Sequence, residues 1–177
     1  MKRGQLISQP FFYIFTIIVI GLLLVFGFKY AGKIMSTGCS VESLDFVNDI
    51  QSKVNEVYSL SYGSSFECSI VSASGQSDSR CELVLPNGVR GFCFVDTKKN
   101  YNENSIIFSD VKTIVTELGS GANKNLFFSS AKGSSCKAEH ALIKKLTTDN
   151  VVCVDPKSKN PSFIIENTGN IVTVKKS

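Results

Sequence analysis

The chain has 177 residues, a formal net charge of +4 and six cysteines, and 43% of its residues are hydrophobic. This hydrophobic fraction excludes a wholly disordered chain, because disordered chains combine low hydropathy with high net charge. The length is that of one folded domain with room for an appendage. A mildly basic balance can indicate a nucleic-acid or membrane partner, so the position of the excess charge matters.

The most pronounced feature of the sequence is an apolar segment near the N-terminus. No charged residue occurs between Gln5 and Phe28, and residues 11–28 are almost purely apolar. As a helix, these 18 residues extend about 27 Å, close to the roughly 30 Å thickness of the hydrocarbon core of a bilayer. With one further turn, the segment predicts a transmembrane helix over residues 11–31, after a short cytoplasmic N-terminus of residues 1–10.

The excess positive charge flanks this apolar segment. Lys2 and Arg3 precede it, Lys29 and Lys33 follow it, and residues 36–177 contain 15 basic and 15 acidic residues. The +4 therefore belongs to the membrane flanks, and the partner that it predicts is the lipid bilayer. No basic patch is left for nucleic acid, and no nucleic-acid-binding motif is present either.

The flanks and the cysteines predict an orientation. Two basic residues and the amino terminus precede the apolar segment, which favours an N-terminus inside the cell. All six cysteines follow the segment, and cysteine enrichment favours an oxidising exterior. We therefore expect a single-pass protein of the cell membrane whose C-terminal domain lies outside.

The first residues resemble a known processing signal. Lys2-Arg3-Gly4-Gln5, directly before an uninterrupted apolar helix, is similar to the class III signal peptides of archaeal type IV pilin-like proteins. In that family a peptidase on the cytoplasmic side cuts after the glycine, and the apolar helix stays on the mature chain. The resemblance implies a cut between Gly4 and Gln5, and a retained helix that anchors the subunit and packs in a filament core.

The resemblance covers about 30 of the 177 residues. Pilins usually carry glutamate as the fifth mature residue, whereas this chain has Gln9 at that place, followed by Pro10. An uncleaved signal anchor is the alternative that the sequence leaves open. Lipidation at Cys39 is not expected, because Ser36 stands where a lipoprotein cleavage box needs an aliphatic residue.

The region after the membrane segment has the pattern of an α+β domain. Residues 32–40 are small and polar and predict a linker to an extracytoplasmic domain, residues 41–177. Apolar residues then recur every three or four positions over residues 41–60, which predicts an amphipathic helix. Strands are predicted at residues 66–71, 81–85, 89–95, 106–108, 126–128, 151–154, 163–165 and 171–174. The expected fold class is α+β, with this helix beside a mixed, mainly antiparallel sheet.

Four connections between these elements are predicted. Pro86-Asn87-Gly88 suits a three-residue hairpin loop that would pair the strands on either side of it. Residues 111–118 predict a helix that ends at Gly119. Residues 138–146 predict another helix, which would join the strands before and after it in one right-handed βαβ crossover. The last two strands would form a hairpin.

Six cysteines in an exterior domain predict disulfides, with a reduced and buried set as the alternative. They are Cys39, Cys68, Cys81, Cys93, Cys136 and Cys153, and no two of them have the close spacing of a zinc site. Cys136 and Cys153 flank a predicted helix and its following strand, which makes them the best local pair. The three-residue hairpin loop would set Cys81 opposite Cys93 and leave Cys39 for Cys68, whereas a two-residue loop would put Cys81 and Cys93 on opposite faces. Cys68–Cys93 is the rival pairing.

No catalytic, cofactor or metal site is predicted. His140 is the only histidine, nothing in the sequence sets a nucleophile beside it, and we expect it on the exposed surface. Residues 130–135, between a strand and a helix, lie where free amides bind anions, but both glycine-rich phosphate motifs are missing.

The functional expectation is a membrane-anchored, non-catalytic surface protein. Its most specific form is a pilin-like structural subunit that assembles with copies of itself or with other surface proteins. The alternative is an extracytoplasmic module whose sheet binds a ligand or a partner. An anchored enzyme is the least favoured class, because the chain has one histidine and no catalytic motif.

Overall fold

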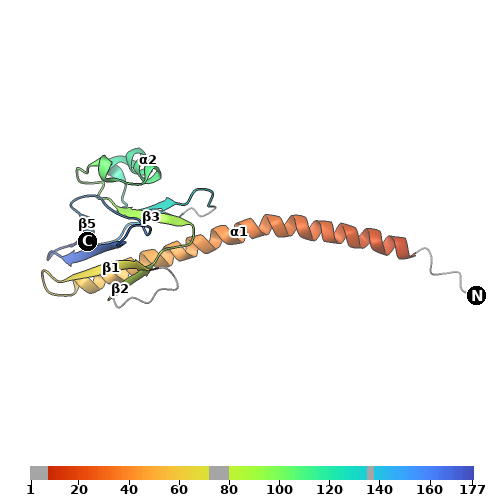
Figure 1. Ribbon diagram of the computed structural model, residues 1–177, viewed down its shortest axis with the longest axis horizontal. Helices are drawn as coiled ribbons and strands as arrows, with labels where there is room; N and C mark the ends of the chain where they lie inside the picture. The colour runs from red at the N-terminus through yellow and green to blue at the C-terminus, as the bar shows by residue number, and fades with distance from the viewer. Residues whose placement is uncertain (1–7, 72–79, 135–137) are drawn as a thin grey trace, which may run out of the picture.

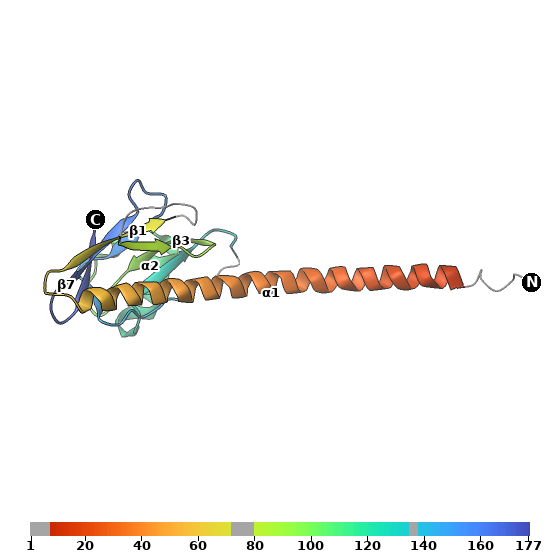
Figure 2. The same ribbon diagram turned by 90° about the horizontal axis from the view of Figure 1, so that it is seen from below.

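The computed structural model describes residues 8–71, 80–134 and 138–177 of the chain. A single helix, α1 (Ser8–Tyr58, 51 residues), forms the long axis of the molecule, and a domain of two sheets and a second helix lies around its C-terminal end (Figures 1 and 2). The expectation of an apolar helix followed by an α+β domain with a mixed sheet is therefore confirmed.

The first half of α1 extends away from the domain (Figure 2). Its stretch Pro10–Tyr30 is 21 residues long, and none of the side chains in its most apolar window is buried. Phe11 and Phe28, near its two ends, are 78% and 79% exposed. A helix of this length and composition is able to cross a membrane.

The second half of α1 packs against the domain along one stripe. Phe46, Ile50, Val54 and Val57 are each at most 2% exposed, and their spacing of three or four residues places them on one helix face. This is the predicted amphipathic helix, and it ends at Tyr58, ahead of a turn with Gly63 at φ +82°.

Residues 32–40, for which a linker was expected, continue the helix. Their two glycines disfavour a helix by about 1 kcal/mol each relative to alanine. A break would require a second helix nucleus, which is costlier than propagating a helix that already exists on both sides. The small residues therefore do not interrupt α1.

A five-stranded mixed sheet, which we call sheet A, packs against α1. Its order is β2-β1-β7-β8-β5, with β1 parallel to β2, β5 parallel to β8, and antiparallel pairing elsewhere. The strands are β1 (Ser65–Val71), β2 (Cys81–Val84), β5 (Leu146–Thr148), β7 (Ser162–Asn167) and β8 (Val172–Lys176). The predicted C-terminal hairpin is confirmed as β7–β8.

A second, antiparallel sheet, sheet B, has the order β4-β3-β6. Its strands are β3 (Val89–Phe94), β4 (Leu126–Ser130) and β6 (Val152–Val154). One face of sheet B packs on α1 and sheet A through edge-to-face aromatic contacts, such as Phe92 with Phe46 at 5.2 Å and with Phe163 at 5.9 Å between ring centroids. The other face is covered by α2 (Ser109–Leu118), on the far side of sheet B from sheet A (Figure 1).

The predicted hairpin around Pro86-Asn87-Gly88 is wrong. The turn itself forms, with the Val89 N–H donating to the Pro86 carbonyl at 3.1 Å and Gly88 at φ +81°. The strands that it joins separate, however, because β2 pairs with β1 in sheet A and β3 pairs with β4 and β6 in sheet B. The turn signal is local, whereas the choice of strand partner depends on residues far away in the chain.

The predicted βαβ crossover is also wrong, because the described residues 138–146 are not helical. The buried Asn125 side chain accepts a hydrogen bond from the Ile143 N–H at 2.7 Å and donates to the Ile143 and Leu146 carbonyls at 2.8 and 3.0 Å. It thereby satisfies backbone groups that a helix would have paired internally. Ala141 forms an antiparallel bridge with Leu126 instead.

The segment around α2 matches its prediction in part. The helix ends at Gly119, with φ +60°, as expected. Residues 106–108 are not a strand but an extended lead into α2, and Ile106 and Phe108 are buried beneath it. Two short 3-10 turns, Glu103–Ser105 and Gly119–Gly121, flank α2.

Candidate functional site

The cysteines form disulfides, but not in the expected pairs. Cys68 bonds to Cys81 and Cys93 bonds to Cys153, with S–S distances of 2.02 and 2.01 Å. Cys39 is also disulfide-bonded, whereas Cys136 lies outside the described residues.

The pairings predicted as Cys136–Cys153, Cys81–Cys93, Cys39–Cys68 and Cys68–Cys93 are therefore wrong. Both observed bonds join residues that lie directly opposite each other on neighbouring strands, β1 with β2 and β3 with β6. The predictions relied on the β2–β3 hairpin and on the helix over residues 138–146, neither of which forms. Each disulfide therefore fastens two strands of the same sheet.

His140 is half-buried rather than exposed, because its ring packs 5.4 Å from that of Phe127. Its Nδ1 accepts a hydrogen bond from the Phe128 N–H at 3.2 Å. Burial lowers the pKa of His140, the positive charge of Lys124 lowers it further, and Asp110 opposes the shift. The shift favours the neutral form of the imidazole.

Ser129 and Ser130, which follow Phe128 on β4, bind a carboxylate. Ser129 is 1% exposed, and its hydroxyl donates to the carboxylate of Asp110 at 2.9 Å. The Ser130 N–H donates to the same carboxylate at 3.1 Å. Among the described residues, the hydrogen bonds of Ser129 and His140 lead to different partners, and such an arrangement does not activate a nucleophile.

Two other sites were considered from the sequence, a processing site and an anion site. The processing residues Gly4 and Gln5 lie outside the described residues. Ser130 ends β4, and a turn with Gly133 at φ +77° follows it, whereas the helix expected to supply a cluster of amides is not formed by the described residues 138–146. In the part of the chain that the structure describes, no group of three or more His, Cys, Asp and Glu side chains is arranged to hold a metal ion.

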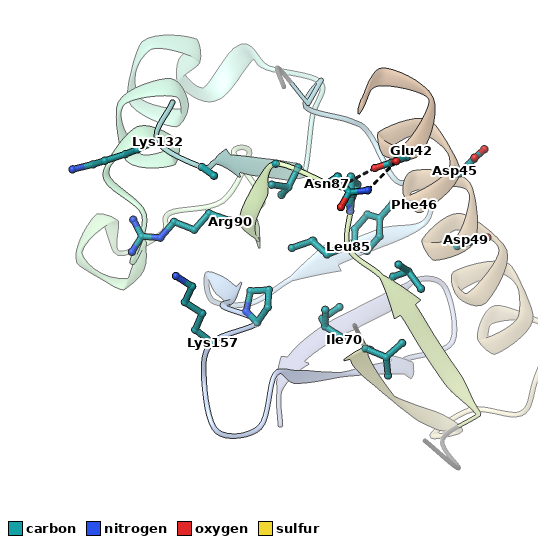
Figure 3. Close-up of a pocket in the computed structure, with 17 residues that line it drawn as sticks. Glu42, Asp45, Phe46, Asp49, Ile70, Leu85, Asn87, Arg90, Lys132 and Lys157 are labelled. Carbon is teal, nitrogen blue, oxygen red and sulfur yellow. Dashed lines mark hydrogen bonds between the residues drawn. The ribbon is translucent and has the colours of Figure 1, made fainter. Parts of the chain in front are cut away.

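A groove of about 850 Å³ lies at the place where the two sheets diverge (Figure 3). Its floor is apolar and includes Phe46, Ile70, Leu85 and Val89. It lies beside the Leu85–Gly88 connection that carries the chain from sheet A to sheet B. A volume of this size is within the range of ligand-binding clefts.

One wall of the groove is acidic and belongs to α1. Glu42, Asp45 and Asp49 follow one another at spacings of three and four residues, which places them on one face of the helix. Glu42 accepts hydrogen bonds from the Asn87 N–H at 2.7 Å and from the Asn87 Nδ2 at 3.1 Å, and so holds the turn against α1 (Figure 3). Asp45 and Asp49 are exposed.

The opposite wall is basic and is assembled from three separate segments. Arg90 comes from β3, Lys132 from the turn after β4, and Lys157 from the loop after β6 (Figure 3). The guanidinium of Arg90 lies 5.5 Å from the ring centroid of Phe108, a cation–π contact that orients it.

The groove is not predictable from the sequence. The acidic residues were visible as the polar face of the predicted helix. The basic residues are more than 20 positions apart in the chain, so nothing in their local sequence signals that they meet. No protein-family model, curated protein or solved structure matches this chain.

Proposed function

We propose that this chain is a membrane-anchored, non-catalytic surface protein that assembles side by side with copies of itself as a pilin-like subunit. The observation that carries the proposal is α1, one unbroken helix that is apolar and exposed over Pro10–Tyr30 and buried along one stripe from Phe46 to Val57. Such a helix joins a membrane anchor rigidly to a folded domain. The proposal also includes an N-terminus inside the cell, which the basic residues before the apolar segment favour.

The outward face of α1 supports assembly with further copies. Val41 and Leu44 are 53% and 58% exposed, although both are large and aliphatic. Val41 lies two residues after the buried Cys39, and Leu44 two residues before the buried Phe46, so each points about 200° around the helix from a buried side chain. A neighbouring α1 would remove these side chains from water, a gain that the isolated domain does not have.

The N-terminus of the protein purified from its own membrane tests the processing that pilin-like assembly implies. Mass spectrometry should find a chain that begins at Gln5, because the proposed cut follows Gly4. An intact Met1 would contradict pilin-like processing and leave an uncleaved anchor.

Substitution on the outward face tests the assembly itself. We expect the double variant Val41→Ser and Leu44→Ser to lower the yield of crosslinked multimers in the membrane. Ile107→Ser is the matched control, because Ile107 is also 58% exposed but lies outside α1. Equal crosslinking of the double variant and the unaltered chain would argue against a contact through this face.

A further inference from the structure

The groove beside α1 combines an apolar floor with two walls of opposite charge. We propose that it binds an extended peptide segment with a basic residue towards Asp45 and Asp49, apolar residues over the floor, and an acidic residue towards Arg90, Lys132 and Lys157. The proposal does not depend on pilin-like assembly, although Asp45 lies one helical turn from Val41 on the same side of α1.

The charges that line the groove are segregated by sign. The region from residue 36 to residue 177 is neutral by count, with 15 basic and 15 acidic residues. Among the residues that line the groove, however, the three acidic ones all come from α1 and the three basic ones from the opposite side, and Figure 3 shows the Asp45 carboxylate turned away from the hollow. Charges of one sign that gather at a cleft create a local potential that attracts the opposite charge.

The acidic and basic side chains of the two walls do not form ion pairs with each other. Among the described residues, no ion pair involves Asp45, Asp49, Arg90, Lys132 or Lys157. The walls are held apart by the apolar floor, in which Phe46 is 1% exposed and Val89 8% exposed. A ligand that spans the floor can therefore meet both walls at once.

The combination of both charges with an apolar floor favours a peptide over other classes of ligand. A nucleic acid or an anionic lipid headgroup would be attracted by the basic wall but repelled by Asp45 and Asp49. A neutral sugar has no charge to place against either wall. A peptide carries a cation, apolar side chains and an anion on one extended backbone, so it matches the groove along its whole width.

The positions of these charges make them suitable for substitution. Asp45, Asp49, Lys132 and Lys157 are exposed, so their neutral variants should leave the core unchanged. Glu42 and Arg90 are better left intact, because Glu42 holds Asn87 and Arg90 contacts Phe108.

The test uses the full chain in detergent micelles and four fluorescein-labelled peptides, read by fluorescence anisotropy. The peptides are Lys-Lys-Leu-Val-Val-Leu-Glu-Glu, its neutral analogue with glutamine at the charged positions, and analogues with only lysine or only glutamate there. We expect the peptide with both charges to bind most tightly. Its affinity should fall when salt is raised, because salt screens exposed charges.

Variants of each wall then identify the groove. Asp45→Asn with Asp49→Asn, and separately Lys132→Gln with Lys157→Gln, should each weaken binding of the dipolar peptide by about two- to fivefold per charge removed. Glu117→Gln and Lys98→Gln remove exposed charges outside the groove and are the matched controls. Circular dichroism and thermal unfolding of each variant verify the fold.

Three outcomes would overturn the proposal. The first is no saturable binding of the dipolar peptide, and the second is equal binding of the neutral analogue. The third is tightest binding of the glutamate-only peptide with no effect of the Asp45 and Asp49 substitutions, which would indicate a simple anion site on the basic wall. Weaker binding by folded variants of either wall, with unchanged binding by the control variants, supports the proposal.

Discussion

Asn167 connects the end of α1 to sheet A. It is 3% exposed, and its side-chain amide donates to the carbonyls of Val57, Tyr58 and Leu60 at 3.3, 3.2 and 2.8 Å. The last carbonyls of a helix have no partner within the helix itself. A side chain from β7 supplies that partner here, so one residue satisfies the helix end and fixes its place on the sheet.

Asn167→Asp should destabilise the protein. The change removes the amide donor and places a negative charge at the C-terminal end of α1, where the helix dipole is also negative. We expect the free energy of unfolding to fall by about 1–3 kcal/mol, the cost of leaving buried polar groups unsatisfied. Denaturant titration of the full chain in micelles measures it. Asn48→Asp, on the exposed side of α1, is the control. Equal stabilities of the two variants would show that the hydrogen bonds of Asn167 to the end of α1 do not stabilise the protein.

His140 should make stability depend on pH below neutrality. Because burial, aided by Lys124, lowers its pKa in the folded state, the unfolded chain binds the proton more readily. The free energy of unfolding should therefore be highest above the unfolded pKa, about 6.5, and decrease as the pH falls below it. His140→Gln should flatten this dependence between roughly pH 7.5 and 5.5. Parallel curves for the two proteins would show that the histidine is not responsible.

The elements show where sequence pattern is sufficient and where it is not. The amphipathic period predicted the part of α1 after the apolar stretch, and the glycine stop predicted that Gly119 closes α2, because both signals are local. The partner of β2 was not predictable, since the turn at residues 86–88 is compatible with a hairpin as well as with a change of sheet. The groove depends on that change of sheet and was missed for the same reason.

The helix predicted at residues 138–146 failed for a related reason. Its pattern of apolar residues is helical, but the buried Asn125 binds its backbone from 18 positions away. A contact of that kind overrides local propensity, which is a weak preference. Burial of a polar side chain with such specific partners cannot be deduced from the segment that it holds.

The two described disulfides should contribute unequally to stability. Cys93 and Cys153 are 60 residues apart in the chain, whereas Cys68 and Cys81 are 13 apart. By loop-closure entropy, replacing both cysteines of a pair by alanine should cost about 4 kcal/mol for the longer loop and about 3 kcal/mol for the shorter one. Denaturant titration of the two double variants compares them. A larger loss for the Cys68 and Cys81 pair would show that the loop-closure entropy of the unfolded chain does not dominate the contribution of these disulfides to stability.

At the scale of the whole molecule, α1 joins the apolar stretch, which is long enough to cross a membrane, to the domain. The charge excess surrounds the apolar stretch, and the domain after it is neutral by count. If the apolar stretch spans a bilayer as proposed, the continuous helix sets the distance of the groove from it: Tyr30 and Glu42 are 12 residues apart, which is about 18 Å along the helix. In the proposed membrane-anchored state, the groove would therefore lie above the headgroups rather than within them.

The proposed orientation places this groove outside the cell. An amine-reactive biotin that cannot cross membranes should then label Lys132 and Lys157 in intact cells, because both side chains are exposed on the domain. Labelling should be the same after lysis, as judged by mass spectrometry of the peptides, while a cytoplasmic protein of the same cells is labelled only after lysis. Lysines of the domain that react only in lysed cells would reverse the orientation. The groove would then face the cytoplasm, and its peptide partner would have to be sought there.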